Sequence, residues 1–321
     1  MRTAYKCRVY PTPEQAAVLN RTFGCVRLVW NRLLGWRQAR WHAERLATNV
    51  SQANAFLSEL KRDPGLAFLR EVSSVPLQQV TRIQQKAFVN FFTGRARYPR
   101  FKSRSGRQSV EYTRSGFRWR DGQLWLAKMN SPLRLVWSWP HIDPASIDPS
   151  TVTLSRDPDG RWYVSLAVEV ADPAPLPSAG AAVGIDLGIT DFAVTSDGDR
   201  VANPRLLERK ARNLARYQRR MARKQRGSNN RAKAKAKIAR AHRKVRAARQ
   251  DFLHRTSTDL VRRYDTIVVE DLNVAGMLRN RKLAKAISDS GWATFRRMLA
   301  YKTHTYGRRL IVIDRWYPSS K

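Results

Sequence analysis

Two acidic residues of this sequence stand where chemistry on a phosphate could occur. Asp186 follows the aliphatic residues 183–185, and Glu270 follows the run 267–269. Short β-branched and aliphatic runs of this kind predict buried strands. A carboxylate at the end of such a strand can hold a hard cation such as Mg²⁺ or Mn²⁺, because these ions take oxygen ligands. Two such carboxylates beside a phosphodiester form the core of metal-assisted phosphoryl chemistry. We therefore expect Asp186 and Glu270 to be metal ligands and catalytic residues.

The neighbouring residues narrow this assignment. Asp271 points to the opposite face of the strand from Glu270, so at most one of the two belongs to the site. We favour Glu270, because it directly follows the aliphatic run. The five histidines have no metal-ligand spacing, and no Cys/His pair or glycine-rich phosphate loop is evident.

The composition indicates a polyanionic partner. Lys and Arg number 61 against 25 Asp and Glu, which gives a formal net charge of +36. Such an excess repels itself unless nucleic acid neutralises it. A basic ribosome-associated or chromatin-like protein would have a similar composition. No apolar run reaches the length of a membrane span, and Cys7 and Cys25 are too few for a disulfide framework. We expect a cytoplasmic, nucleoid-associated protein.

Two basic segments are candidates for binding nucleic acid. Residues 204–250 hold nineteen Lys and Arg and one acidic residue, so ion pairs along a helix cannot neutralise them. The expected phosphate contacts there are Arg219, Arg220, Arg223, Lys224, Arg243, Lys244 and Arg246. Residues 95–107 interleave cations with aromatic rings, which suits unpaired RNA bases. The candidates there are Tyr98, Arg100 and Lys102. In the alternative interpretation this segment is an ordinary connection with Phe101 packed inside.

The first half of the chain predicts strands interrupted by helices. Residues 2–10 alternate as a half-buried strand, and Thr12 before Pro13 predicts a helix start. Further helices are predicted over 51–62 and 76–93. The short strands that follow are predicted at 117–119, 124–126, 133–137, 151–154 and 162–168. We expect 1–10 and 96–172 to close into a small β-barrel, with 11–95 as a helical insert.

The second half predicts an α/β domain after a Pro-rich linker at 173–181. We place this domain at 182–321. Its expected elements are a strand at 183–187, a hairpin through 196–199, two basic helices within 204–262, a strand at 266–270, a helix at 286–307 and a strand at 310–313. Helices inserted between strands are typical of α/β organisation.

Several motifs in one order resemble the TnpB family of transposon-encoded, RNA-guided DNA endonucleases, which is related to type V CRISPR nucleases. In the second half they are residues 183–189, 249–254, 269–273, 287–292 and 316–321; in the first half they are residues 8–15 and 98–102.

The resemblance implies a wedge-like β-barrel with a helical recognition insert, followed by an RNase H-like RuvC domain. It also implies a guide RNA from the transposon end, and double-stranded target DNA cut next to a short adjacent motif. The family uses a three-carboxylate, two-metal site, of which Asp186 and Glu270 match the first two carboxylates. Gln78 and Thr113 are the nearest matches to the positions that read the adjacent motif.

The sequence departs from the family pattern at its end. In the family, a stretch like residues 317–321 precedes a four-cysteine zinc ribbon and then the third catalytic Asp. The sequence stops at Lys321, so zinc is expected only if a ribbon lies beyond it, and Asp314 does not match the third carboxylate. We expect either a fragment of an RNA-guided endonuclease or a shortened, cleavage-deficient RNA-guided DNA-binding protein that acts as a repressor. A transposase acting directly on transposon ends is a third hypothesis.

Overall fold

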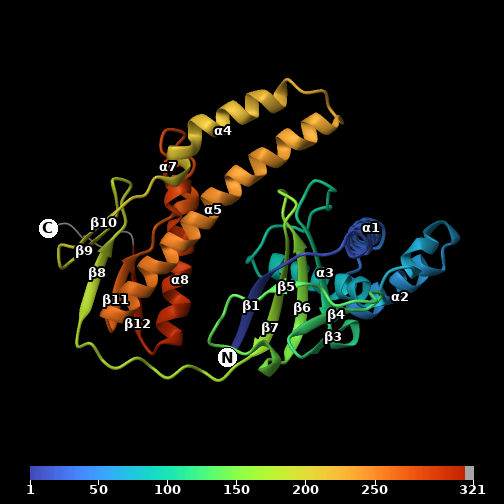
Figure 1. Ribbon diagram of the computed structural model, residues 1–321, viewed down its shortest axis with the longest axis horizontal. Helices are drawn as coiled ribbons and strands as arrows, with labels where there is room; N and C mark the ends of the chain where they lie inside the picture. The colour runs from blue at the N-terminus through green and yellow to red at the C-terminus, as the bar shows by residue number, and fades with distance from the viewer. Residues whose placement is uncertain (315–321) are drawn as a thin grey trace. The chain divides into compact units, whose positions relative to one another are not determined.

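The computed structural model describes residues 1–314, and the chain forms two compact units (Figure 1). Unit 1 comprises residues 1–170, and unit 2 begins at residue 171, where the Pro-rich segment starts. Within residues 1–314, no helix has both the length and the hydrophobicity needed to cross a membrane.

Unit 1 contains an antiparallel five-stranded sheet with the order β2-β6-β7-β1-β5. The strands are β1 (Arg2–Val9), β2 (Gln108–Thr113), β5 (Leu135–Val136), β6 (Pro149–Arg156) and β7 (Trp162–Glu169). A separate hairpin joins β3 (Phe117–Arg120) to β4 (Gln123–Leu126). Within residues 1–314 the edge strands β2 and β5 do not pair with each other, so the sheet is open. The predicted closed barrel is therefore not confirmed.

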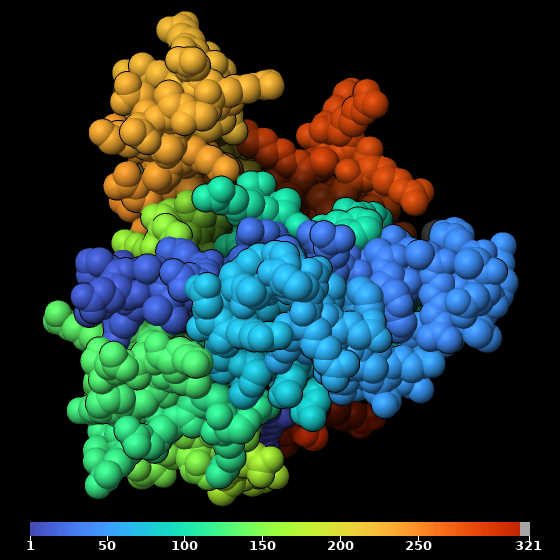
Figure 2. All heavy atoms as spheres, turned by 90° about the vertical axis from the view of Figure 1, so that its right-hand side faces the viewer, coloured from blue at the N-terminus to red at the C-terminus, as the bar shows by residue number. Residues whose placement is uncertain are grey.

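Helices pack against this sheet and enclose the hydrophobic core between them. They are α1 (Pro13–Glu44), α2 (Val50–Arg62) and α3 (Ser74–Phe92), with a 3₁₀ segment η1 (Pro64–Arg70) before α3. Figure 2 shows them at the surface of unit 1, coloured from dark blue to cyan. The predicted start of α1 is confirmed, because the Thr12 hydroxyl accepts from the Gln15 N–H and the Gln15 side chain accepts from the Thr12 N–H.

Sheet and helices of unit 1 share one hydrophobic core. Leu33 of α1 and Leu77 of α3 belong to the same buried cluster as Val152 of β6 and Leu166 of β7. All four side chains are almost inaccessible to solvent. The helical segment is thus packed into the sheet's core and does not have one of its own.

Unit 2 is built on a mixed five-stranded sheet with the order β10-β9-β8-β11-β12. The strands are β8 (Ala182–Asp186), β9 (Asp191–Thr195), β10 (Arg200–Ala202), β11 (Thr266–Glu270) and β12 (Arg309–Ile313). Strands β8, β9 and β10 are antiparallel, whereas β11 runs parallel to both β8 and β12. Helices α5 (Asn229–Arg263) and α8 (Trp292–Thr305) contribute Leu253, Leu260, Phe295 and Leu299 to the core beneath one face.

The prediction of two basic helices is confirmed, since α4 (Leu206–Ala222) is followed by α5 after a short turn. The prediction of one helix over 286–307 is wrong. The chain forms α7 (Ala284–Ser290) and α8, which are separated by Gly291 at φ +75°. A short helix α6 (Val274–Met277) follows β11. Gly291 ends α7 as a left-handed C-cap, at a point where the backbone passes close to α5.

Candidate active site and nucleic-acid interface

The register of the parallel strands β8 and β11 brings the two predicted carboxylates together. Val183 lies opposite Ile267, and Ile185 lies opposite Val269. These are the last pairs of the register, and Asp186 and Glu270 are the next residues of the two strands. Neighbouring strands are about 4.8 Å apart, and in-register residues project from the same face. Both carboxylates therefore stand side by side at the carboxyl ends of two adjacent strands.

The two carboxylates project away from the helical core. Ile185 and Val269 are buried beneath α5 and α8, so the next residue of each strand faces the other way. Asp186 is exposed and Glu270 is half-buried. The chain turns sharply after Asp186, where a Cβ on Gly188 would lie only 2.8 Å from the Asp191 carbonyl oxygen. Glycine at this position thus lets β9 return beside β8 directly behind the carboxylate.

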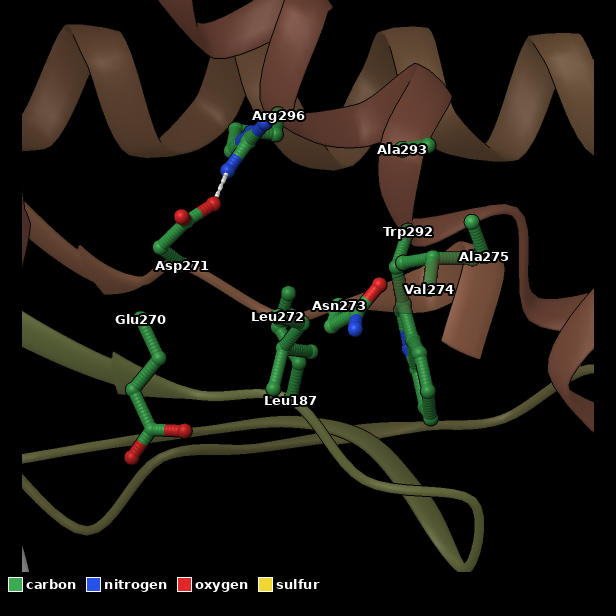
Figure 3. Close-up of a pocket in the computed structure, with 10 residues that line it drawn as sticks. All are labelled: Leu187, Glu270, Asp271, Leu272, Asn273, Val274, Ala275, Trp292, Ala293 and Arg296. Carbon is green, nitrogen blue, oxygen red and sulfur yellow. Dashed lines mark hydrogen bonds and ion pairs between the residues drawn. The ribbon is translucent and has the colours of Figure 1, made fainter. Parts of the chain in front are cut away.

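Asp271 occupies a different environment. Its carboxylate forms an ion pair with Arg296 of α8, and its N–H donates to the Ile313 carbonyl oxygen at 2.9 Å. Figure 3 shows the Glu270 carboxylate pointing away from this ion pair. Asp271 therefore ties the end of β11 to α8 and β12. The geometry is that expected from strand alternation, with Glu270 on the face of Asp186.

A hollow of about 330 Å³ lies beside Glu270 (Figure 3). Its lining includes Leu187, Glu270, Asp271, Asn273, Trp292 and Arg296. The Trp292 ring is 3% exposed, and its Nε1 has no hydrogen-bond partner within residues 1–314. The Asn273 side chain accepts from the Gly276 N–H at 3.0 Å and so starts α6. This hollow therefore borders the end of β11 on the side of α6 and α8, and Asp186 is not part of its lining.

The donor atoms of this pair suit a hard cation. Mg²⁺ in proteins is commonly held by one or two carboxylates, with water and substrate phosphates completing its coordination. Asp186 and Glu270 supply such oxygen donors. In the described part of the chain, no group of three or more His, Cys, Asp or Glu gathers as a metal site. Asp314 follows β12 and is exposed.

Asp289, to which the sequence motifs gave no role, is a buried acid that anchors the basic hairpin formed by α4 and α5. Asp289 of α7 is 9% exposed and accepts from the Leu207 N–H at the start of α4 at 2.7 Å. It also accepts from Arg249 Nη2 of α5 at 2.6 Å. A carboxylate at a helix N-terminus is favoured by the helix dipole. The available signal was an acidic residue within the motif at 287–292 of a very basic chain.

The hairpin of α4 and α5 carries the predicted phosphate contacts. Arg243 is half-buried, and the exposed members are Arg219, Arg220, Arg223, Lys224, Lys244 and Arg246. A hollow of about 310 Å³ on the hairpin is lined by four cations, namely Arg220, Lys224, Lys233 and Lys237. None of its lining residues within 1–314 is acidic. This surface is suited to phosphate groups.

The candidate nucleic-acid-binding residues of unit 1 differ in how far their side chains are exposed. Gln78 is exposed on α3, and Thr113 ends β2 half-buried. Arg100 is exposed, although its carbonyl oxygen accepts from Trp30 Nε1 at 2.9 Å. Lys102 is half-buried with its Nζ 4.0 Å from the Trp30 ring centroid, and burial lowers the pKa of its ammonium. Lys102 is therefore held against α1 rather than projecting freely.

The aromatic residues of the same segment are not core residues. Phe101 is 56% exposed, so the alternative in which it packs inside is wrong. Tyr98 is 40% exposed and meets the rings of Phe88 and Phe91 edge-on. Rings at the surface are available to stack on bases.

Comparison with known proteins identifies the family. Residues 165–281 match the OrfB_IS605 family, described as a probable transposase, and residues 1–46 match the helix-turn-helix domain of that family. A Streptomyces pristinaespiralis protein named RNA-guided DNA endonuclease is 52% identical over 322 residues, which span 100% of this chain and 79% of that protein. The chain belongs to this OrfB, or TnpB-like, family. The family expected from the motifs is thereby confirmed.

Further relatives of this TnpB-like protein agree. InsQ of Escherichia coli K12, also named RNA-guided DNA endonuclease, is 28% identical over 337 residues, covering 99% of this chain and 82% of InsQ. A cryo-EM structure of a Cas12f1-sgRNA-target DNA complex matches with a TM-score of 0.60 and 13% identity, covering 94% of this chain and 74% of Cas12f1. That likeness shows a shared fold. In the segment matched as helix-turn-helix, the structure has β1 and the single long helix α1.

Proposed function

We propose that this TnpB-like protein is an RNA-guided DNA endonuclease that hydrolyses target DNA with a metal-dependent RuvC-type site. The observation that carries the proposal is the register of β8 and β11, which pairs Ile185 with Val269 and so supports a position of Asp186 beside Glu270 at adjacent strand ends. Relatives that carry the name RNA-guided DNA endonuclease align along nearly the whole chain. The mixed sheet of unit 2, with three antiparallel strands continued by two parallel ones, supports an RNase H-like fold for this domain.

Asp186 and Glu270 are the proposed ligands of Mg²⁺ or Mn²⁺. The bound ion would supply a Lewis acid for the phosphodiester and lower the pKa of a bound water. The surrounding residues hold the carboxylates in place. The Asp271–Arg296 ion pair fixes the end of β11, and Gly188 permits the turn that follows Asp186. The ligands thus project from strand ends that are fixed before substrate arrives.

The proposed partners are a guide RNA from the transposon end and double-stranded target DNA. The cations of α4 and α5 would contact phosphates, while guide pairing reads the target sequence. Gln78 and Thr113 remain the proposed readers of the adjacent motif, and both lie in unit 1. We keep residues 1–10 with 96–172 as the wedge-like part, and 11–95 as the recognition insert of that unit.

The test begins with the protein purified from a host that also carries its native flanking DNA. We expect one discrete, structured RNA that ends in a variable segment. With that RNA and Mg²⁺, target DNA should be cut next to a short motif. Asp186→Asn and Glu270→Gln should each slow cutting by at least about a hundredfold, because metal stabilisation of the transition state contributes several kcal/mol.

Asp259→Asn is the matched control. Asp259 is an exposed carboxylate of unit 2 paired with Arg263 one helical turn away, so its variant has the same charge change outside the site. The control should cut at the wild-type rate, and all three variants should retain the RNA. Loss of RNA from Asp186→Asn would mean that Asp186 is structural and that the assigned site is wrong.

A second candidate function is RNA-guided DNA binding without cleavage. It is favoured by one observation, namely that no third acidic residue gathers with Asp186 and Glu270 as a metal site among residues 1–314. This candidate predicts a discrete bound RNA and sequence-specific DNA binding, with target DNA left intact in Mg²⁺ and in Mn²⁺. Heterogeneous RNA that modest salt releases would instead indicate a transposase that acts directly on transposon ends.

A further inference from the structure

An aromatic groove in unit 1 is not used by the proposed cleavage site. It lies among the last turns of α1, the segment 46–48, α3 and Tyr98, and has a volume of about 380 Å³. That volume is in the usual range of small-ligand sites. Its lining includes Arg37, Trp41, Leu46, Phe88, Phe92 and Tyr98. We refer to it below as the Arg37 groove.

The Arg37 groove exposes large apolar side chains. Phe92 is 76% exposed, and Trp41 and Val89 are each about half exposed. Phe91 and Phe92 lie with ring centroids 5.2 Å apart, and Tyr98 meets Phe91 edge-on at 5.1 Å. Contiguous exposed apolar side chains mark a binding surface rather than a solvated one. The rings suit a flat, apolar ligand face.

The guanidinium of Arg37 places unused hydrogen-bond donors at the groove. The residue is 6% exposed, and its Nη1 donates to Gln85 Oε1 at 2.9 Å. Its Nε and Nη2 are buried and have no hydrogen-bond partner in the described part of the chain. Its Cζ lies 5.2 Å from the Phe88 ring centroid, and burial lowers the pKa of the guanidinium. A buried cation with two unused donors is costly unless a ligand supplies acceptors.

The charge around the groove favours a phosphorylated ligand. Among residues 1–314, no Asp or Glu lines it. Three exposed cations, Arg95, Arg97 and Arg100, flank Tyr98 in the chain. The carbonyl oxygens of an apolar peptide could accept from Arg37, but such a peptide would bring no negative charge to Arg95, Arg97 and Arg100. The ligand must therefore combine a flat apolar face, a pair of neighbouring acceptors and an adjoining negative charge.

We propose that the Arg37 groove holds one unstacked guanine nucleotide of the guide RNA. Unpaired RNA bases are commonly recognised by stacking on aromatic side chains and by hydrogen bonds to their edges. Guanine presents the acceptors O6 and N7 side by side, which a guanidinium can bind with two donors. Its flanking phosphates would meet Arg95, Arg97 and Arg100. The choice of RNA as the source of the base rests on the proposed function.

The test uses the full-length protein freed of bound RNA, without Mg²⁺, and short fluorescent oligonucleotides at one fixed salt concentration. The probes are nine-residue oligouridylate, the same RNA with a central guanosine, and that RNA with 7-deazaguanosine, which lacks the N7 acceptor. Fluorescence anisotropy gives their dissociation constants. We expect the guanosine probe to bind roughly tenfold more tightly than oligouridylate, and the 7-deaza probe to lose most of that gain.

Phe92→Ala tests the stacking surface, because this ring is exposed and its removal leaves the core intact. It should weaken guanosine binding roughly tenfold, since base stacking is worth about 1–3 kcal/mol. Phe68→Ala, which removes an exposed ring of η1 outside the groove, should change it less than twofold. Arg37→Lys should abolish the difference between guanosine and 7-deazaguanosine, because lysine keeps the charge and loses the paired donors.

Three results would overturn the proposal. The first is equal affinity of the wild type for all three probes, and the second is an equal effect of Phe92→Ala and Phe68→Ala. The third is a Phe92→Ala variant that sediments as a monomer where the wild type is a dimer, which would make a second copy the occupant. An equal guanine preference for the DNA version of the probe would overturn the choice of RNA. None of these assays requires cleavage or a native guide, so a failed cleavage assay leaves them interpretable.

Discussion

Replacing Gly291 with alanine tests how the helical break between α7 and α8 is held. Gly291 has φ +75°, and a Cβ there would lie 3.2 Å from Arg249 Cδ and 3.3 Å from Leu253 Cδ1 of α5. The left-handed backbone costs a non-glycine residue about 1–2 kcal/mol. Crowding of a packed site costs about 1–3 kcal/mol more. We therefore expect Gly291→Ala to destabilise unit 2 by about 2–5 kcal/mol.

Gly227→Ala separates the two contributions. Gly227 has φ +85° in the turn between α4 and α5, but a Cβ there would meet no atom within 4 Å. This variant carries the same backbone cost and the same change in the unfolded chain without crowding. The difference between the two variants should be about 1–3 kcal/mol, and it belongs to the contact with α5.

Native-state hydrogen exchange, followed by mass spectrometry, measures this difference in unit 2 alone. Peptides from α5 and α8 report the free energy of opening of the elements that meet at Gly291. Gly291→Ala should exchange there roughly 5- to 150-fold faster than Gly227→Ala, since each 1.4 kcal/mol is a factor of ten. Equal exchange in the two variants would refute the claim that the backbone at Gly291 packs closely on α5.

Three further predictions concern charged groups of unit 2. Asp289→Ala removes the acceptor for the Leu207 N–H and the partner of Arg249, and it should destabilise the base of the hairpin by about 3 kcal/mol, seen as faster hydrogen exchange in α4. Burial lowers the pKa of Lys302 to about 8, so above that pH the unfolded chain binds more protons than the folded chain. The free energy of unfolding should therefore rise from pH 8 to 10.5 relative to that of Lys302→Met. Urea titrations in which the free energy of unfolding changes equally with pH in both proteins would contradict this. Hydrogen bonds from the Ala179 N–H and the Ser178 hydroxyl lower the pKa of Asp265 to about 2, so its stabilisation is present above pH 4 and lost as the pH falls towards 2, and acid unfolding of the wild type and Asp265→Asn should converge there.

Local patterns predicted the strands that carry the carboxylates. The aliphatic runs before Asp186 and Glu270 end within a residue of β8 and β11, because buried central strands need such side chains on their core face. Strand alternation also separated Glu270 from Asp271. Local residue patterns could not predict that β8 pairs with β11, because this pairing joins segments more than eighty residues apart in the chain.

The features missed by sequence analysis depend on contacts between distant segments. The helix end at Gly291 had a local signal, because glycine favours the left-handed C-cap conformation, whereas its close approach to α5, some forty residues earlier, had none. An arginine such as Arg37 is normally expected on the solvent-exposed face of a helix, and it is buried because α3 packs against α1. The open sheet of unit 1 reflects the shortness of β5, which pairs with β1 at two positions. None of these follows from residue types at fixed spacing.

The common core of unit 1 limits how this chain can be shortened or recombined. A helical insert that folded by itself could be replaced as a unit by that of a homologue without changes to the sheet. Here Leu33 and Leu77 fill the same interior as Val152 and Leu166, so excising residues 13–92 would leave an apolar sheet face in water. A minimal version of the protein would have to trim exposed ends and loops, or redesign that sheet face together with its helices. Change in the helices of residues 13–92 is therefore coupled to change in the strands on which they pack.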